Sequence, residues 1–87
     1  MRVRGVHWML LTPREEELLM RPVPDSDKRY NAHTVRMLQA KVQGAGTLSP
    51  ELELTEPELQ QVKRSRRDWK GGHEKPLQAV LDAMARH

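Results

Sequence analysis

The 87-residue chain contains no cysteine, phenylalanine or isoleucine, and its aromatic residues are two tryptophans and one tyrosine. Without cysteine, neither a disulfide nor a thiolate-bound metal can stabilise the fold. No apolar run approaches the ~20 residues that a membrane-spanning helix requires. A domain of this length buries little more than about 60% of the surface of its unfolded chain. Leucine, valine and methionine must therefore build a small core, and self-association is one way to bury more area.

The sequence also lacks the residue patterns of catalytic and metal sites. The chain has four histidines, His7, His33, His73 and His87. No two of them are four residues apart, which is the spacing of the metal ligands on a zinc-protease helix. The glycines at 44–46 and 71–72 match neither a phosphate-binding loop nor a dinucleotide-binding fingerprint, and they are typical of helix ends. We therefore expect a protein that is not an enzyme and that binds no metal and no cofactor.

Basic residues exceed acidic residues by 15 to 12, which gives a net charge of +3 and an isoelectric point of about 9.7. This mild excess permits an anionic partner without requiring one. The apolar piece within the first eleven residues is too short for the core of a signal peptide. We expect a cytoplasmic protein with no membrane partner.

The hydrophobic pattern predicts both strands and helices. Alternation over residues 3–11 predicts a strand, and the run Glu-Leu-Glu-Leu at 51–54 predicts a second strand that pairs with it. Start and stop signals predict four helices, at about 13–20, 26–43, 56–70 and 74–86. We expect one mainly helical α+β domain, residues 1–87, with about four helices and a minimal two-stranded sheet. A small all-helical bundle is the alternative.

The helix expected at 26–43 has two alternative N-caps, Asp25 and Ser26. Its broad apolar stripe follows spacings of three and four residues and comprises Tyr30, Thr34, Met37, Leu38 and Val42, together with Val35. The glycines that follow at 44 and 46 end it. This pattern predicts an amphipathic helix that packs one face against the core.

Two of the predicted helices begin with similar sequences, LTPREEELL and LTEPELQQV. Each has a threonine, a proline in the first turn and a glutamate three residues after the threonine, namely Thr12 with Glu15 and Thr55 with Glu58. This is the pattern of a capping box, so the glutamates have a structural reason. A duplication and convergence on a good helix start both explain the repeat, and convergence is the simpler explanation.

The segment KRSRRDWKGGH, residues 63–73, concentrates five cations in eight residues. On a helical projection four of them form one stripe beside Trp69, namely Lys63, Arg66, Arg67 and Lys70, while Arg64 lies farther round. The helix macrodipole favours cations at this end, so a solvated helix end is one explanation. Like charges four residues apart repel each other, however, and only Asp68 is interspersed. A surface for an anionic partner is therefore the other explanation.

Two residues within this segment bear on its role. Trp69 continues the apolar face of Leu59 and Val62, where it either belongs to the core or stacks on a base or anchors a protein interface. Arg66 falls in the middle of that face, so its guanidinium must reach the edge or meet an acid. The candidate binding residues are Lys63, Arg64, Arg66, Arg67, Trp69 and Lys70.

The last helix has a narrow apolar stripe made of Leu77, Val80, Leu81 and Met84. A stripe this narrow indicates a helix that docks on one neighbour. That neighbour is either another part of this chain or a second copy of it, so these four residues are the candidates for self-association.

These patterns favour two classes of function. The leading expectation is a small non-enzymatic protein that contacts nucleic-acid phosphates through the cationic stripe. A DNA-reading helix-turn-helix is disfavoured, because the last helix has few polar residues suited to base edges. The competing expectation is a protein-interaction module, either an accessory subunit or a small inhibitor of a larger complex. It would meet an acidic protein surface through Trp69 and Arg66, or a partner through the last helix.

Overall fold

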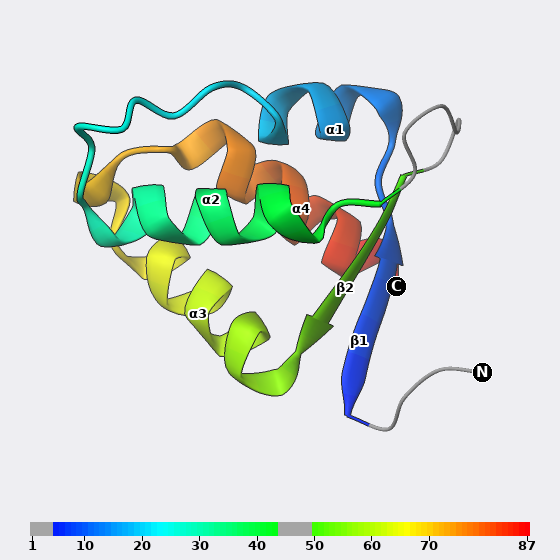
Figure 1. Ribbon diagram of the computed structural model, residues 1–87. Coiled ribbons are helices and arrows are strands. Elements are labelled where there is room, and N and C mark those ends of the chain that lie inside the picture. Colours follow the sequence, from blue (N-terminus) through cyan, green and yellow to red (C-terminus); the bar gives the residue numbers. More distant parts are fainter. Residues whose placement is uncertain (1–4, 44–49) are drawn as a thin grey trace.

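The computed structural model describes residues 5–43 and 50–87, and for Trp69 it describes the backbone (Figure 1). The elements follow in the order β1 (Val6–Leu10), α1 (Pro13–Leu19), α2 (Tyr30–Lys41), β2 (Glu51–Thr55), α3 (Glu56–Arg67), the 3₁₀ turn η1 (Trp69–Gly71) and α4 (Glu74–Arg86). The predicted α+β class is confirmed, and the all-helical alternative is wrong. Within these ranges no helix is long and apolar enough to cross a membrane.

The two strands form an antiparallel sheet in which His7 lies opposite Leu54 and Met9 lies opposite Leu52. The predicted pairing is therefore confirmed, although β1 is shorter than the predicted strand and residues 3 and 4 lie outside the described ranges. Alternation places Met9, Leu52 and Leu54 on the face that packs against the helices, and all three are buried.

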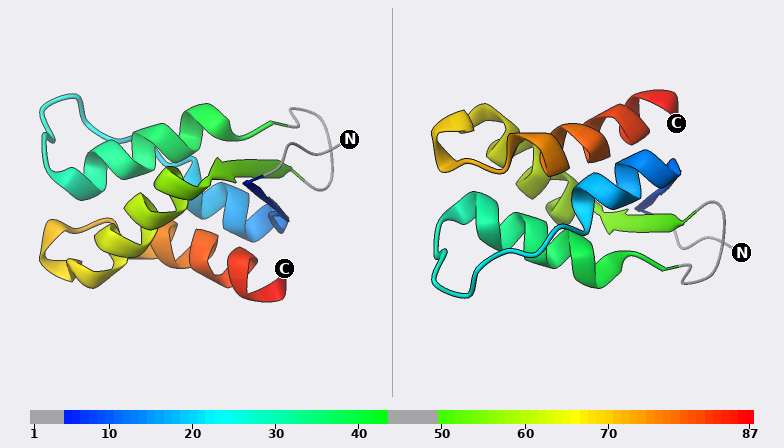
Figure 2. Two further views of the ribbon diagram at one scale, coloured as in Figure 1. Left: turned by 90° about the horizontal axis from the view of Figure 1, so that it is seen from below. Right: turned by 90° about the horizontal axis from the view of Figure 1, so that it is seen from above.

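The helices surround a core that lies on one side of this sheet (Figures 1 and 2). Helices α1 and α3 lie on opposite faces of the molecule, and each packs against both α2 and α4. The sheet closes one end of this arrangement. The core cluster comprises Met9, Leu11, Leu19, Val35, Leu38, Leu52, Leu54, Leu59, Val62, Leu77, Val80 and Ala83.

Both predicted capping boxes are present. The Glu15 N–H donates to Thr12 Oγ1 at 3.1 Å, and the Thr12 N–H donates to Glu15 Oε1 at 2.8 Å. Thr55 and Glu58 make the same reciprocal pair at the start of α3. Each box satisfies two backbone groups that a helix start leaves without intrahelical partners, which explains why α1 and α3 begin where the sequence predicts.

The prediction for α2 is wrong at its start. The helix begins at Tyr30 rather than at 26, Arg29 is its N-cap without a side-chain hydrogen bond, and neither Asp25 nor Ser26 caps it. A tertiary contact explains the difference. The Asp27 carboxylate contacts His73, the N-cap of α4, as well as Arg29, and these contacts hold the segment before Tyr30 as a loop. The buried face of α2 includes Thr34, Val35 and Leu38 of the predicted stripe, but it also includes Asn31 and Ala32, and Tyr30 is exposed.

The helix predicted at 56–70 is also shorter, because α3 ends at Arg67 with Asp68 as its C-cap. A buried amide of α2 holds the turn that follows. The Asn31 Nδ2 group donates to the backbone oxygens of Asp68 at 2.6 Å and Gly72 at 3.0 Å. Gly72 has a φ of +78° in this turn, and α4 then begins at Glu74 as predicted.

The apolar stripe of α4 packs inside the chain. Leu77 and Val80 are fully buried, and Leu81 and Met84 are partly buried against the core. Two of the four residues predicted for self-association, Leu77 and Val80, are thus packed inside this chain, where α1 and α3 contact α4. Self-association through this helix stays a prediction.

Candidate nucleic-acid interface

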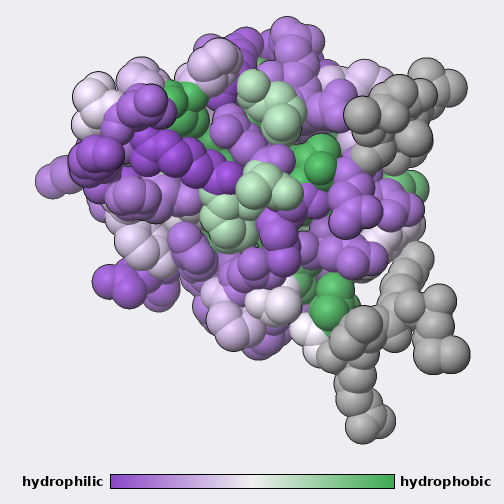
Figure 3. Space-filling view, in the orientation of Figure 1, coloured by the Kyte–Doolittle hydropathy of each residue, from purple (hydrophilic) through white to green (hydrophobic). Residues whose placement is uncertain are grey.

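One end of the molecule gathers segments that lie far apart in the sequence. Residues 25–30 and 67–74 meet there, at the start of α2, the end of α3 and the start of α4; we call this the loop end, and the opposite one the sheet end (Figure 1). The space-filling view shows hydrophilic side chains covering the loop end (Figure 3). It is here that the basic segment of the sequence lies.

Four exposed cations occupy the surface at the end of α3 and in η1. Lys63, Arg64, Arg67 and Lys70, which we call the cationic surface, are all exposed. None of the four forms an ion pair within residues 5–43 and 50–87. Their positive charge is thus turned toward solvent and is not matched by neighbouring carboxylates in contact with them.

The packing of α3 explains why these side chains point outward. Leu59, Val62 and Ser65 are buried at intervals of three residues, so the core face of the helix runs along this line. Residues on the opposite side, including Arg64 and Arg67, are therefore directed into water. The capping box at the other end of α3 sets this register from the first turn.

The predicted stripe of four cations is not one helical stripe. Because α3 ends at Arg67, Lys70 lies beyond a turn. Ser65 takes the buried position in the last turn, and Arg66 is exposed instead of lying within the apolar face. Arg66 borders a hollow of about 360 Å³ whose other lining residues belong to the start of α4: Glu74, Lys75 and Gln78. The role predicted for the Trp69 side chain lies outside the described part of the structure and stays a prediction.

Tyr30 is a residue of this surface that sequence reasoning assigned to the core. It is the first residue of α2 and is 39% exposed, and the guanidinium carbon of Arg64 lies 5.0 Å from the centre of its ring. Such a distance is that of a cation–π contact. Placing the helix start at Tyr30 would have revealed its exposure, but that start depends on the tertiary contacts of the preceding loop.

The Tyr30–Arg64 pair borders a shallow hollow of about 340 Å³ between α2 and α3. Its lining residues are Tyr30, Pro57, Gln60, Gln61, Arg64 and Arg67. The hollow therefore combines an aromatic ring, two guanidinium groups and two amides, and sequence reasoning missed the amides of Gln60 and Gln61.

Neutral hydrogen bonds connect one lining residue of this hollow, Gln61, to buried hydroxyl groups. The hydroxyls of Thr34 and Ser65 are 2.6 Å apart and buried, and Gln61 Nε2 donates to Thr34 Oγ1 at 3.2 Å. These bonds join α2 to α3 without using any charged group. Of the cations at this hollow, Arg64 also contacts α2, through the ring of Tyr30.

At the loop end the carboxylate of Asp27 has hydrogen-bond partners of its own. This carboxylate accepts hydrogen bonds from Arg29 at 3.0 and 2.8 Å and lies 2.9 Å from His73 Nε2. The hydrogen bonds from Arg29, followed by that from His73, hold the pKa of Asp27 far below its usual range. Because two partners already engage this carboxylate, it does not reach the cationic surface.

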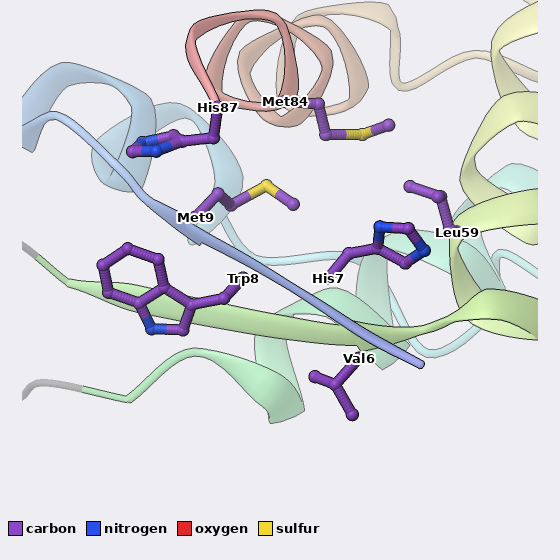
Figure 4. A pocket seen from close by; sticks show the side chains of 7 residues that line it. All are labelled: Val6, His7, Trp8, Met9, Leu59, Met84 and His87. Carbon is purple, nitrogen blue, oxygen red and sulfur yellow. The ribbon is translucent and has the colours of Figure 1, made fainter. Parts of the chain in front are cut away.

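A third hollow, of about 410 Å³, lies between β1, the start of α3 and the end of α4 (Figure 4). Met9 and Met84 border it, and both of its histidines have structural partners. His7 Nε2 lies 2.6 Å from Glu56 Oε2, and the Leu10 N–H donates to His87 Nε2 at 3.2 Å. Among the described residues no cluster of three histidine or acidic side chains could hold a metal ion.

Comparisons of the chain with protein-family models, with curated proteins and with solved structures found no match. The geometry of the molecule is thus the basis for inferring its function. Within that geometry, the cationic surface brings together four exposed cations within eight residues, and none of the four forms an ion pair in the described ranges.

Proposed function

We propose that this protein is a non-enzymatic nucleic-acid-binding protein that holds phosphates through the cationic surface. The observation that supports this proposal is the exposure of Lys63, Arg64, Arg67 and Lys70 without an ion pair in the described ranges. Phosphate groups are the complementary partner, because arginine and lysine donate charge-assisted hydrogen bonds to their oxygens.

The concentration of these cations, rather than the absence of ion pairs alone, supports this interpretation, because Arg21, Lys28 and Lys75 are also exposed without an ion pair in the described ranges but are spread along the chain. Lys41 pairs with Glu58 at 2.8 Å, and Arg86 pairs with Glu15. Lys63 and Arg67, by comparison, are like charges four residues apart on one helix, an arrangement that destabilises a helix by a few tenths of a kcal/mol. The macrodipole accounts for a basic helix end but not for this density of like charge.

Contacts of this kind would be mostly independent of sequence. Phosphate oxygens are the same at every nucleotide, so side chains that bind them position the protein without reading bases. Binding would also weaken steeply with salt, because each neutralised phosphate releases condensed counterions. Four phosphates on duplex DNA would give a slope of about −3.6 in a plot of log affinity against log salt concentration.

The test is a titration of the purified chain with labelled duplex and single-stranded DNA and RNA at several salt concentrations, followed by anisotropy. The variant Lys63→Glu/Arg67→Glu should lose at least 30-fold in affinity and show a slope reduced by about two. The control Arg14→Glu/Arg21→Glu has the same net charge but alters exposed residues elsewhere, and it should retain most of the affinity and the full slope. Equal losses in both variants would show that only net charge matters.

Absence of binding to all of these nucleic acids at low salt would contradict the proposal. The competing expectation, an acidic protein partner, is then tested with polyglutamate as the probe under the same conditions. A salt-sensitive complex with polyglutamate, without binding to nucleic acid, would assign the cationic surface to an acidic protein face.

A further inference from the structure

We infer that the hollow at Tyr30 accepts an unpaired base, so that the nucleic acid bound by this protein is single-stranded. This inference rests on the proposed function and identifies its ligand class. It begins from the position of Tyr30, an aromatic residue 39% exposed beside two of the four cations of the cationic surface.

The Tyr30–Arg64 contact is the first argument. The guanidinium carbon lies 5.0 Å from the ring centre, which joins a flat aromatic group to a flat cation at the edge of the hollow. Proteins bind the bases of single strands by stacking them on aromatic rings and on arginine guanidinium groups. The pair therefore places both kinds of stacking partner at the edge of the hollow, and a base can stack on the ring or on the guanidinium.

The amides of the hollow are the second argument. The Gln61 Nε2 group is held by the buried hydroxyl of Thr34 at 3.2 Å, which orients this amide at the hollow. Within residues 5–43 and 50–87, no hydrogen bond engages its Oε1 atom. This oxygen is available to accept a hydrogen bond from an amino group of a base, while Arg67 lies at the same hollow for the adjoining phosphate.

The size of the hollow is the third argument. A volume of about 340 Å³ lies at the small end of the range for ligand pockets, so it suits one planar group rather than a double helix. In a duplex the bases are stacked on their neighbours and cannot enter without being flipped out. A single strand presents its bases without that unstacking and unpairing step, which favours single-stranded ligands over duplexes.

The experiment compares a 20-nucleotide oligothymidine, the corresponding oligouridine and a 20-base-pair duplex at one salt concentration. The wild type should bind the better of the two single strands at least about 10-fold tighter than the duplex. Tyr30→Ala should lose about 5- to 100-fold in affinity for that strand, the range measured for single base-stacking contacts, and should bind the duplex as the wild type does. Tyr30→Phe keeps the ring and should remain within about twofold of the wild type.

The salt dependence separates this inference from the proposed function. Tyr30→Ala removes a stacking contact and no cation, so its salt slope should equal that of the wild type, whereas Arg67→Gln should reduce the slope by about 0.7 on a single strand. Equal affinity of the wild type for single strands and duplex would overturn the inference and leave the proposed function intact. The inference would also be overturned if Tyr30→Ala lost the same factor of affinity for the single strand and for the duplex. Failure of all three nucleic acids to bind would remove the proposed function itself.

Circular dichroism of each variant checks that the fold is retained. The wild-type preference for single strands needs no substitution, so it tests the inference even where Tyr30→Ala lowers stability. Tighter binding of the duplex by the wild type would also overturn the inference, because the hollow would then border the phosphate-binding surface without accepting a base.

Discussion

At the sheet end opposite charges join the elements, whereas at the loop end neutral amides and hydroxyls make most of the joins. Arg86 Nη1 and Nη2 bind the Glu15 carboxylate at 2.6 and 2.5 Å, which ties the end of α4 to the start of α1. At the loop end, Asn31 holds the backbone after α3, and Thr34 contacts Ser65.

The difference shows how a small protein can leave a cluster of charge available. In an ion pair that joins two helices, the carboxylate stays beside the cation and neutralises its charge, so the cation is less able to bind another anion. The Lys41–Glu58 ion pair joins α2 to α3 at the end of α2, whereas neutral hydrogen bonds join the two helices at Thr34, so no carboxylate is paired with Arg64 or Arg67 there. The Asp27–Arg29 pair also lies at the loop end, but it is confined to the loop before α2 and its contact with His73.

The largest effect on stability is expected from Glu15→Ala at the sheet end. The Glu15 side chain is only 10% exposed, and it supplies both a capping box and the ion pair with Arg86. Removing it should lower the free energy of unfolding by about 2 kcal/mol, measured by urea denaturation. Glu17→Ala is the control, because Glu17 makes an exposed pair with Arg14. Similar losses in the two variants would mean that ion pairs do not stabilise the sheet end.

A somewhat smaller effect is expected from Gly71→Ala at the loop end. A Cβ atom on Gly71 would lie 2.7 Å from Asn31 Nδ2, so the amide would have to move from its two backbone acceptors. The loss of stability should be about 1.5 kcal/mol. In an Asn31→Ala background the added methyl group has room, and the same substitution should have almost no further effect. Strict additivity would contradict the role given to Asn31.

Acid should weaken the sheet end through Glu15. Hydrogen bonds from Arg86 lead the effects that hold the pKa of Glu15 below its ordinary value of 4.5, despite the opposing effect of burial. A carboxyl group whose pKa is lowered by folding stabilises the fold above its unfolded pKa and loses that contribution as pH falls through the folded value. The stability difference between wild type and Glu15→Gln should therefore shrink below about pH 4.5. A difference that stays constant down to about pH 2 would contradict this account.

The smallest effect is expected from Arg67→Gln in the cationic surface. Because it relieves repulsion with Lys63, it should leave stability unchanged or raise it by up to ~0.3 kcal/mol. Lys41→Gln, which breaks the partly buried pair with Glu58, should lower stability instead. Thermal unfolding of both variants in low salt compares them directly. A loss in Arg67→Gln equal to that in Lys41→Gln would make the cations of the loop end structural.

Sequence reasoning located the features that depend on neighbouring residues. The two capping-box sequences, each with a threonine, a proline and a glutamate, predicted the starts of α1 and α3, and alternation in the two apolar runs predicted the sheet. These signals are local, because a capping box involves four residues and a strand repeats every two. The basic segment at 63–70 was likewise visible in the sequence as a charged helix end.

The features that sequence reasoning missed depend on residues far apart along the chain. Asn31 meets Asp68 and Gly72 across 37 and 41 residues, and Glu15 meets Arg86 across 71. Periodicity assigned Tyr30 to the buried stripe of its helix and Arg66 to the apolar face of α3. In the structure both are exposed, because neighbouring elements cover a different part of each helix.

By itself the sequence determined the class of fold, the helix starts with capping boxes and the sign of the charge at the end of α3. Only the tertiary structure decided which cations share a hollow with Tyr30, and that the apolar stripe of α4 packs inside this chain. The physical reason is that caps and alternation act within one turn or one strand, whereas exposure and pairing are decided by the elements that pack against each residue.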